Sequence, residues 1–398
     1  MRFAICFTNF GPYHLARLRA LGQALRANRG ELIAYEVAGR EQRYPWTPER
    51  SAEPFSWRTF FPDSTLEHLN PSACRDAISR HLDQDDPDAV AAVGYARPES
   101  LAMLSWARGQ SRPCILMSES QSIDKPRVWW KEALKTRRVK RFSSALVGGP
   151  AHRDYLIELG MPAERIALGY NAVDHDSIRD QVDQFRNASK IAPVTRPYFL
   201  AVNRFVPEKN LERLVRAHAA HRTTLGANKA WDLVLCGDGS ERPKLEQLVT
   251  RLGLNESVHF PGFLQEKELI PWWAGASAFV HPSLMEPWGL VVNEAAACRL
   301  PLLVSTHAGC METLVPEPSG TTGRRFDPAH DERLTQALNW MACLSTEERE
   351  AMGQRAEFNA REWGPARFAQ GTLEAIDLAL PHAGRRKNSN QVFTMGSV

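Results

Sequence analysis

Two glutamates flank a proline and glycine turn in the segment His281 to Ala295. We expect Glu286 just before a helix and Glu294 about two turns inside it, which separates the carboxylates by roughly 10 Å along the axis. Pro287 suits the first turn of that helix. The unpaired amides at the helix start would belong to Trp288, Gly289 and Leu290. Such amides bind anions, so the segment predicts a phosphate site with a carboxylate at each end.

Two cations follow another apolar run, Tyr198 to Val202. Arg204 and Lys209 stand five residues apart in the loop after it. Fixed cations in a dry cleft stabilise negative charge where it develops. An arginine and a lysine at this spacing are also common in a solvated basic loop. Their position directly after a predicted strand is what favours an anion-binding site.

Short apolar or β-branched runs alternate with segments of helical spacing along the whole chain, as in βα units stacked on a parallel sheet. The expected strands of the first half are 3–7, 32–37, 89–93, 115–117, 145–147 and 166–168. Those of the second half are 198–202, 233–236, 258–260, 278–280 and 302–304. The predicted fold class is α/β, with two Rossmann-like doubly wound domains that face each other across a cleft. Ligands bind such pairs beyond the carboxyl ends of the strands.

The polar stretch between the two sets predicts the domain boundaries. We expect a first domain at 1–178, a linker at 179–196 and a second domain at 197–363. A helix at 364–380 is expected to pack back on the first domain, and 383–398 to form a flexible tail.

The second half resembles glycosyltransferase family 4. In that family two glutamates separated by seven residues follow a strand that ends in H/Y-P-S, as Glu286 and Glu294 do here. The loop Asn203 to Asn210 resembles the family's G-R-L-x-x-E-K-G/N segment. Further similar pieces, in the family's order, are Gly237 to Gly239, Val258 to Leu264 and Ala308 to Glu312. Ala308 departs from the glycine more often found at its position.

The resemblance implies a GT-B fold, retention of anomeric configuration and no metal requirement. It assigns Glu286 to the hydroxyls of the donor sugar and Glu294 to the ribose of the nucleotide. It assigns Arg204 and Lys209 to the donor diphosphate, which the helix start near Gly289 also binds. The backbone around Phe263 would lie beside the nucleobase. Together with Pro287, Trp288 and Leu290, these residues form the predicted catalytic and donor-binding set.

The first domain offers three further candidates. In the resembling enzymes the first βα loop borders the donor phosphates and the acceptor, a position that Gly11 and His14 occupy here. A single histidine is more often structural than catalytic, but its place in this loop makes both roles about equally expected for His14. After the strand 115–117 many relatives carry a histidine that reaches the sugar, whereas this chain has Ser118, Glu119 and Ser120. Glu119 is therefore a candidate sugar or acceptor contact, with a solvated carboxylate as the alternative.

Composition restricts the partners. The formal net charge of +3 argues against nucleic acid. Seven scattered cysteines favour a reducing cytoplasm over a disulfide framework or a zinc site. No run approaches the ~18 apolar residues of a membrane span.

The stretch 125–141 is basic and aromatic, which suits either contact with the inner face of a membrane or a solvated helix face. A D-x-D pattern at Asp86 and Asp88 precedes a buried strand, so we interpret it as a turn and predict no metal.

The predicted function is a retaining glycosyltransferase that moves a sugar from a UDP- or GDP-linked donor to a glycan, a lipid-linked acceptor or a small molecule, without a cofactor. Two alternatives stay open: another GT-B enzyme, such as a phosphorylase or a nucleotide-sugar epimerase, and a non-catalytic nucleotide-sugar-binding module. The sequence leaves the base, the sugar, the acceptor and the oligomeric state undetermined.

Overall fold

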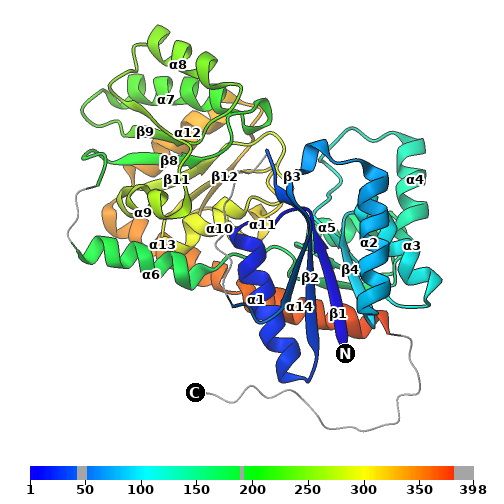
Figure 1. Cartoon of the computed structure of the whole chain (residues 1–398). Helices are drawn as coiled ribbons and strands as arrows, with labels where there is room; N and C mark the ends of the chain where they lie inside the picture. The colour runs from blue at the N-terminus through cyan, green and yellow to red at the C-terminus, as the bar shows by residue number, and fades with distance from the viewer. Residues whose placement is uncertain (43–51, 189–191, 381–398) are drawn as a thin grey trace.

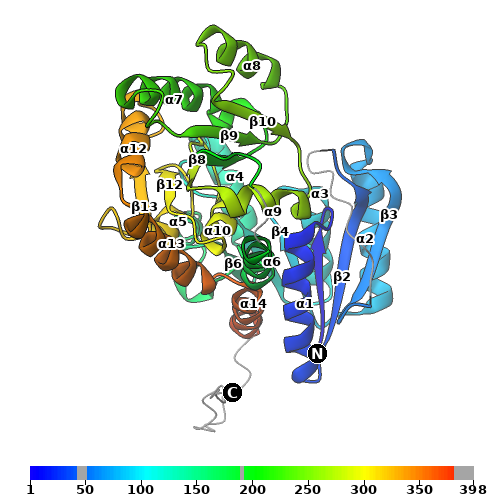
Figure 2. The same ribbon diagram turned by 90° about the vertical axis from the view of Figure 1, so that its left-hand side faces the viewer.

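The computed structural model describes residues 1–42, 52–188 and 192–380. They form two parallel sheets, each covered by helices on both faces, that lie side by side (Figures 1 and 2). This is the two-domain α/β fold that the sequence predicts. The expected tail, 383–398, lies outside the described residues. Within the described ranges, no helix combines the length and apolarity needed to cross a bilayer.

The first sheet has seven parallel strands in the order β3-β2-β1-β4-β5-β6-β7. Its strands are β1 (Arg2–Phe7), β2 (Glu31–Arg40), β3 (Ser56–Thr65), β4 (Ala89–Val93), β5 (Cys114–Ser118), β6 (Ser144–Val147) and β7 (Ile166–Leu168). The helices of this half are α1 (Pro12–Ala27), α2 (Pro71–Asp85), α3 (Pro98–Gly109), α4 (Trp129–Val139) and α5 (Pro150–Glu158). Short 3₁₀ turns span Leu66–His68 and Ala163–Arg165.

The second sheet has six parallel strands in the order β10-β9-β8-β11-β12-β13. Its strands are β8 (Tyr198–Val202), β9 (Asp232–Cys236), β10 (Val258–Gly262), β11 (Ala278–His281), β12 (Leu302–Ser305) and β13 (Gly323–Phe326). The helices are α7 (Leu211–Leu225), α8 (Arg242–Arg251), α9 (Glu266–Gly275), α10 (Leu290–Ala297), α11 (Met311–Leu314), α12 (Asp331–Cys343) and α13 (Thr346–Arg361), with a 3₁₀ turn at Pro207–Lys209.

Two helices connect or cross the halves. The stretch that we expected as a linker, 179–196, begins inside α6 (His175–Asn187). This helix packs on α9 and α10 and buries Ile178 and Val182. The last described helix, α14 (Pro365–Ala379), runs beside α1 and contacts β5, β6 and β7 (Figure 2). Phe368 of α14 is fully buried in the core beneath the first sheet. The end of the chain therefore contributes to the core of its beginning.

Each sheet has a core on both of its faces, as buried parallel strands require. All eleven expected strands are present, but two further strands, β3 and β13, were not expected. Both lie at an edge of their sheet. β3 contains Pro62 and is half-exposed, and β13 carries Arg324 and Arg325. Edge strands tolerate proline and charge, so neither produces an apolar run.

Candidate functional site

The segment after β11 is held in place by the loops that follow β8 and β12. The amide of Leu284 donates to the carbonyl of Glu208 at 2.8 Å, and Asn210 Nδ2 donates to the carbonyl of Pro282 at 3.1 Å. On the other side the amide of Gly309 donates to the carbonyl of Glu286 at 3.0 Å. A Cβ on Gly309 would lie 1.9 Å from the carbonyl oxygen of Pro287, so only glycine fits there. These contacts bring the Lys209 loop against Glu286.

The carboxylate of Glu286 is the centre of a compact polar cluster. Its Oε2 accepts hydrogen bonds from Lys209 Nζ and, at 2.9 Å, from His281 Nε2. The side chains of Lys209 and Glu286 are each only 13% exposed, and His281 is fully buried. Ser283 Oγ lies 3.2 Å from His281 Nε2. Lys209 and Glu286, both predicted as site residues, therefore lie in direct contact.

The cluster fixes the protonation of its members. Burial alone would raise the pKa of Glu286, but the hydrogen bond from His281 and the positive charge of Lys209 outweigh it and lower that pKa to about 2. Burial lowers the pKa of His281, although Glu286 opposes the shift. At neutral pH Glu286 is therefore ionised and His281 is uncharged, with its proton on Nε2, the nitrogen that faces the carboxylate.

Helix α10 begins next to this cluster. It starts at Leu290, and Gly289 is its N-cap residue, with φ +100°. Pro287 lies before the helix, so the expectation that it occupies the first turn was wrong; the left-handed backbone at Gly289 delays the helix by one turn. A Cβ on Gly289 would lie 3.3 Å from Glu286 Cγ. The first amides of α10, which have no partner within the helix, therefore open beside the Glu286 side chain.

The side chain of Trp288 joins the two domains. It is almost fully buried, and its Nε1 donates to Asn293 Oδ1 at 2.9 Å. A Cβ on Gly149, in the loop after β6, would lie 2.9 Å from Trp288 Cζ3, and the Trp363 ring is 5.1 Å away. The indole thus packs directly on the backbone of the first domain, a role that the sequence did not suggest.

Glu294 lies in the second turn of α10 and contacts the first domain. Tyr13 Oη, from the start of α1, donates to Glu294 Oε1 at 2.6 Å. Burial raises the pKa of Glu294 to about 7; the hydrogen bond from Tyr13 opposes this shift and the charge of Glu266 adds to it. The two predicted glutamates therefore differ, since Glu286 is ionised at neutral pH and Glu294 is close to half protonated.

Loops of the first domain also hold the backbone on either side of the turn. Gln121 Nε2, after β5, donates to the carbonyl of Glu286 at 3.0 Å. His152 Nε2, at the start of α5, lies 2.7 Å from the carbonyl of Pro287. Because His152 Nδ1 accepts a hydrogen bond from the amide of Gly149 at 3.1 Å, the proton that faces Pro287 is on Nε2. Both contacts reach the site segment from across the domain boundary.

The first βα loop places His14 as an uncharged hydrogen-bond donor. The amide of Gly11 donates to His14 Nδ1 at 3.1 Å, so the ring proton is on Nε2. Burial, reinforced by Arg17, lowers the pKa of His14 to about 3. The ring packs on Phe7 with centroids 4.6 Å apart.

A buried polar group surrounds Glu119. Burial raises the pKa of this carboxyl; the charge of Arg17 opposes the shift, and that of Glu286 adds to it. Arg17 is buried, and its Nε donates to the carbonyl of Ala172 at 3.1 Å. Among the described residues, Arg17 Nη2 is buried and has no hydrogen-bond partner.

The remaining candidates are more peripheral. Arg204 pairs with Glu208 of its own loop at 3.8 Å, and its side chain is 27% exposed. Phe263, which follows β10, is 44% exposed. The described contacts thus join Lys209 and Glu286 beside the start of α10.

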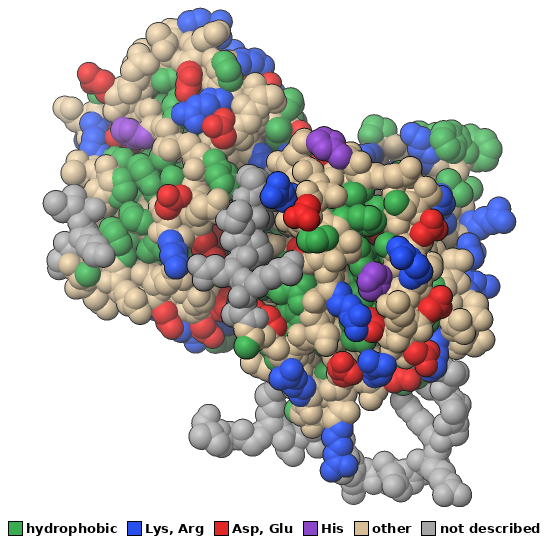
Figure 3. Space-filling view, in the orientation of Figure 1, with side chains coloured by type: hydrophobic (Ala, Val, Ile, Leu, Met, Phe, Trp, Pro, Cys, Tyr) green, Lys and Arg blue, Asp and Glu red, His purple; other side chains and the backbone are tan. Residues whose placement is uncertain are grey.

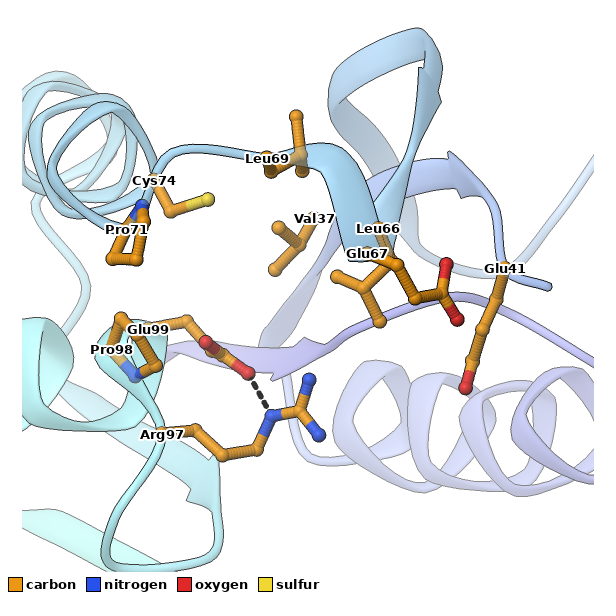
Figure 4. Close-up of a pocket in the computed structure, with 10 residues that line it drawn as sticks. All are labelled: Val37, Glu41, Leu66, Glu67, Leu69, Pro71, Cys74, Arg97, Pro98 and Glu99. Carbon is orange, nitrogen blue, oxygen red and sulfur yellow. Dashed lines mark hydrogen bonds and ion pairs between the residues drawn. The ribbon is translucent and has the colours of Figure 1, made fainter. Parts of the chain in front are cut away.

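A separate cavity of about 310 Å³ lies within the first domain, between β2 and the starts of α2 and α3 (Figure 4). Val37, Leu66 and Leu69 form part of its wall, and Arg97 forms an ion pair with Glu99 on another side. None of the predicted site residues lines it.

The acids of the D-x-D pattern serve the turn before β4. Asp86 ends α2 with a left-handed backbone, φ +39°, and pairs with Arg112 at 3.4 Å. Asp88 accepts a hydrogen bond from the amide of Arg2 at 2.8 Å and forms an ion pair with Arg112. Within the described parts of the chain, no group of three or more His, Cys, Asp or Glu side chains is arranged to hold a metal ion.

Two parallel α/β domains meet along the segment that carries Glu286 and Glu294, and Lys209 from the loop after β8 contacts that segment. This arrangement is the GT-B class of fold. Solved structures agree across nearly the whole chain. The sucrose-phosphate synthase of Thermosynechococcus elongatus superposes with a TM-score of 0.73 at 19% identity, covering 94% of this chain and 97% of that one. The Anabaena protein HepE, solved with UDP and glucose, gives 0.68 at 18% identity, covering 95% and 99%.

Sequence comparison gives a family match. Residues 183–358 match the model of the glycosyl transferases group 1 family. An uncharacterized glycosyltransferase of Methanocaldococcus jannaschii is 36% identical over 121 residues, which are 30% of each chain. The alpha-D-kanosaminyltransferase of Streptomyces kanamyceticus is 30% identical over 200 residues, 49% of this chain and 50% of that protein. The matched segments therefore span half or less of these relatives.

Four residues at the site were not singled out from the sequence as functional. His281 had a signal, because it ends the strand before Glu286 and belongs to the quoted H-P-S pattern. Tyr13, Gln121 and His152 had none, because each reaches the site only through a contact between residues more than a hundred positions apart.

Proposed function

We propose that the chain transfers a sugar, with retention of anomeric configuration, from a nucleotide diphosphate donor to a glycan, a lipid-linked molecule or a small acceptor. The observation that carries the proposal is the contact between Lys209 and Glu286 beside the start of α10. In a bound donor the transferred sugar and the diphosphate are adjacent. In this chain the Glu286 carboxylate, which can accept hydrogen bonds from sugar hydroxyls, lies next to the Lys209 ammonium, which can bind phosphate oxygens.

Lys209 is able to donate hydrogen bonds to Glu286 and to a diphosphate at the same time. An ammonium group has three N–H donors, and Glu286 accepts one of them. The other two are available to a diphosphate, together with the first amides of α10. Ionised Glu286 accepts hydrogen bonds from the hydroxyls of the sugar. Arg204, in the same loop as Lys209, is proposed to reach the outer diphosphate oxygens.

Glu294 is proposed to bind the ribose, with the base beside the backbone at Phe263. The donor would then extend from Glu286 past the helix start to the second turn of α10. We propose a UDP- or GDP-linked donor, and the complex of HepE with UDP and glucose supports the UDP-linked class. Gly11 and His14 would border the phosphates, and His14 Nε2 would donate a hydrogen bond to them or to the acceptor.

The proposed reaction needs no side-chain base. The bond between the anomeric carbon and the diphosphate breaks, and Lys209, Arg204 and the helix amides stabilise the charge on the leaving oxygens. The acceptor hydroxyl attacks from the same face and passes its proton to an oxygen of the departing phosphate. We propose that the reaction requires neither a metal nor a cofactor, as the resemblance to the family implies.

Three variants test the assignment. We expect Glu286→Ala and Lys209→Ala to lower nucleotide release by roughly 10²–10³-fold, the usual loss when a group that stabilises developing charge is removed. Asp86→Ala, a matched loss of a carboxylate outside the site, leaves the rate unchanged. The assay follows nucleotide release with the nucleotide sugar that raises Tm most in a thermal-shift screen. Turnover of Lys209→Ala at the wild-type rate with saturating donor would remove the phosphate role.

Product analysis separates the rival activities. A glycosyltransferase yields free nucleotide diphosphate and a glycosylated acceptor, both identified by mass. Release of a sugar phosphate that depends on added phosphate, or release of a free epimerised sugar, would show another enzyme of this fold. Donor binding by calorimetry without nucleotide release, whatever the acceptor, would show a binding module.

A further inference from the structure

Helix α4 presents an outward face of tryptophan, leucine and cations, which we call the basic face. Trp129 is 82% exposed, Trp130 53% and Leu134 42%, unusual values for large apolar side chains in a folded protein. The exposed cations that accompany them are Lys131, Arg137, Lys140 and Arg141. In Figure 3 hydrophobic side chains project over α4 at the upper right, beside lysine and arginine.

Glu132, the acidic residue of α4, is paired with neighbouring residues of the first domain. Glu132 accepts from Lys135 Nζ at 2.7 Å, from Arg127 at 2.9 Å and from Tyr155 Oη at 3.0 Å. Val139 is fully buried and anchors the end of the helix. Glu132 is the only acid between Lys125 and Arg141, a stretch that is fully described, so the outward face carries positive charge without a compensating carboxylate of its own.

We propose that the basic face docks the protein on an anionic lipid surface. Phosphate headgroups pair with the cations, while the tryptophan and leucine side chains enter the boundary between headgroups and acyl chains. A nucleic-acid backbone would use the cations but would leave exposed Leu134 in water. Lipid therefore matches both components of the face, whereas nucleic acid matches one.

A short stretch of chain links the basic face to a residue that contacts the site segment. Gln121 hydrogen-bonds the backbone of Glu286, and only seven residues separate it from Trp129. Ile123, within that connection, is also exposed, at 56%. Docking through α4 would therefore bring the site close to the membrane surface, where a lipid-linked acceptor is presented.

Vesicle sedimentation of the full chain tests the proposal. We compare vesicles of phosphatidylcholine with vesicles that also contain phosphatidylglycerol, and expect binding to the anionic vesicles that is lost at about 1 M salt, where charges are screened within roughly 3 Å. The variant Lys131→Gln, Arg137→Gln, Arg141→Gln should bind them about a hundredfold more weakly, at roughly fivefold per cation. Its matched control, Lys229→Gln, Arg251→Gln, Arg333→Gln, removes three exposed cations of the second domain and should bind as the wild type.

A second variant, Trp129→Ser with Trp130→Ser, tests insertion. Both side chains are exposed, so the fold should persist, and we expect weaker vesicle binding at unchanged charge. Equal binding of wild type to both vesicle types, or equal loss in the second-domain control, would overturn the proposal. Retention on RNA without vesicle binding would assign the face to nucleic acid instead. Lys209→Ala should bind vesicles normally, so failure of the proposed transfer and failure of docking are distinguishable.

Discussion

The protonation of Glu294 should make donor affinity depend on pH. Burial raises the pKa of this carboxyl to about 7. If the carboxylate accepts hydrogen bonds from the ribose hydroxyls, the ionised form is the better binder, because hydrogen bonds to charged groups are roughly twice as strong. The ionised fraction rises from about one in eleven at pH 6 to about ten in eleven at pH 8. The donor Kd should therefore fall up to about tenfold over that range.

Two other titratable groups of the site, His14 and Glu286, do not produce this slope. The pKa of His14 is lowered to about 3 and that of Glu286 to about 2, so neither titrates between pH 6 and pH 8. The measurement is titration calorimetry with an intact nucleotide sugar, whose diphosphate is esterified at both ends and carries no proton that titrates in this range. The control is Glu294→Gln, which should bind with one affinity at every pH.

Tyr13→Phe sharpens the test. The hydrogen bond from Tyr13 holds the pKa of Glu294 down, so its loss should move the midpoint of the affinity curve to higher pH. A wild-type Kd that is constant from pH 6 to pH 8 would refute the reasoning, and so would a Glu294→Gln variant that reproduces the wild-type slope.

Three further predictions concern stability, measured by urea unfolding. The raised pKa of Glu294 means that the folded chain holds a proton that the unfolded chain releases near pH 4.5, so stability falls as pH rises from about 4.5 to about 7. At about 1.4 kcal/mol per unit, Glu294→Gln should be more stable than wild type at pH 8 by up to roughly 3 kcal/mol, and a less stable variant would contradict the assignment. Trp288→Ala should lose about 3–5 kcal/mol, because it empties a buried contact between the domains; a loss below about 1 kcal/mol would show that the contact is dispensable. Gly289→Ala should lose about 1–2 kcal/mol, because its φ of +100° strains any side chain, whereas a neutral effect would mean that the turn relaxes.

Much of the fold was predictable because buried parallel strands are continuous apolar runs. β8 and β11 show this, since all but Val202 of their nine positions are buried. The edge strand β13 escaped prediction for the converse reason, since Arg324 and Arg325 are only partly buried at an edge that requires no apolar run. The start of α10 was misplaced because Pro287 is a helix-start signal, while the left-handed Gly289 that sets the start is invisible in residue type alone.

The candidate site was predictable in its members and less so in its contacts. The spacing of Glu286 and Glu294 and the position of Lys209 came from residue types and order. The direct pair of Lys209 with Glu286 depends on two loops 77 positions apart, and the bond of Tyr13 to Glu294 spans 281 positions. Distances of this kind follow from how the two domains pack, which local pattern does not encode.

Some contacts across the domain boundary use backbone carbonyls and leave the glutamate side chains available to a ligand, whereas one contact uses a glutamate carboxylate itself. Gln121 and His152 bind the carbonyls of Glu286 and Pro287, so they fix the turn while the Glu286 side chain remains directed at Lys209. Tyr13 instead binds the Glu294 carboxylate itself, the group proposed for the ribose. A donor would therefore share or displace the contact of Tyr13 and leave those of Gln121 and His152 in place. Donor binding should accordingly loosen the boundary at α1 while the sugar end stays closed, because only at Glu294 do the domain contact and the ligand compete for one carboxylate.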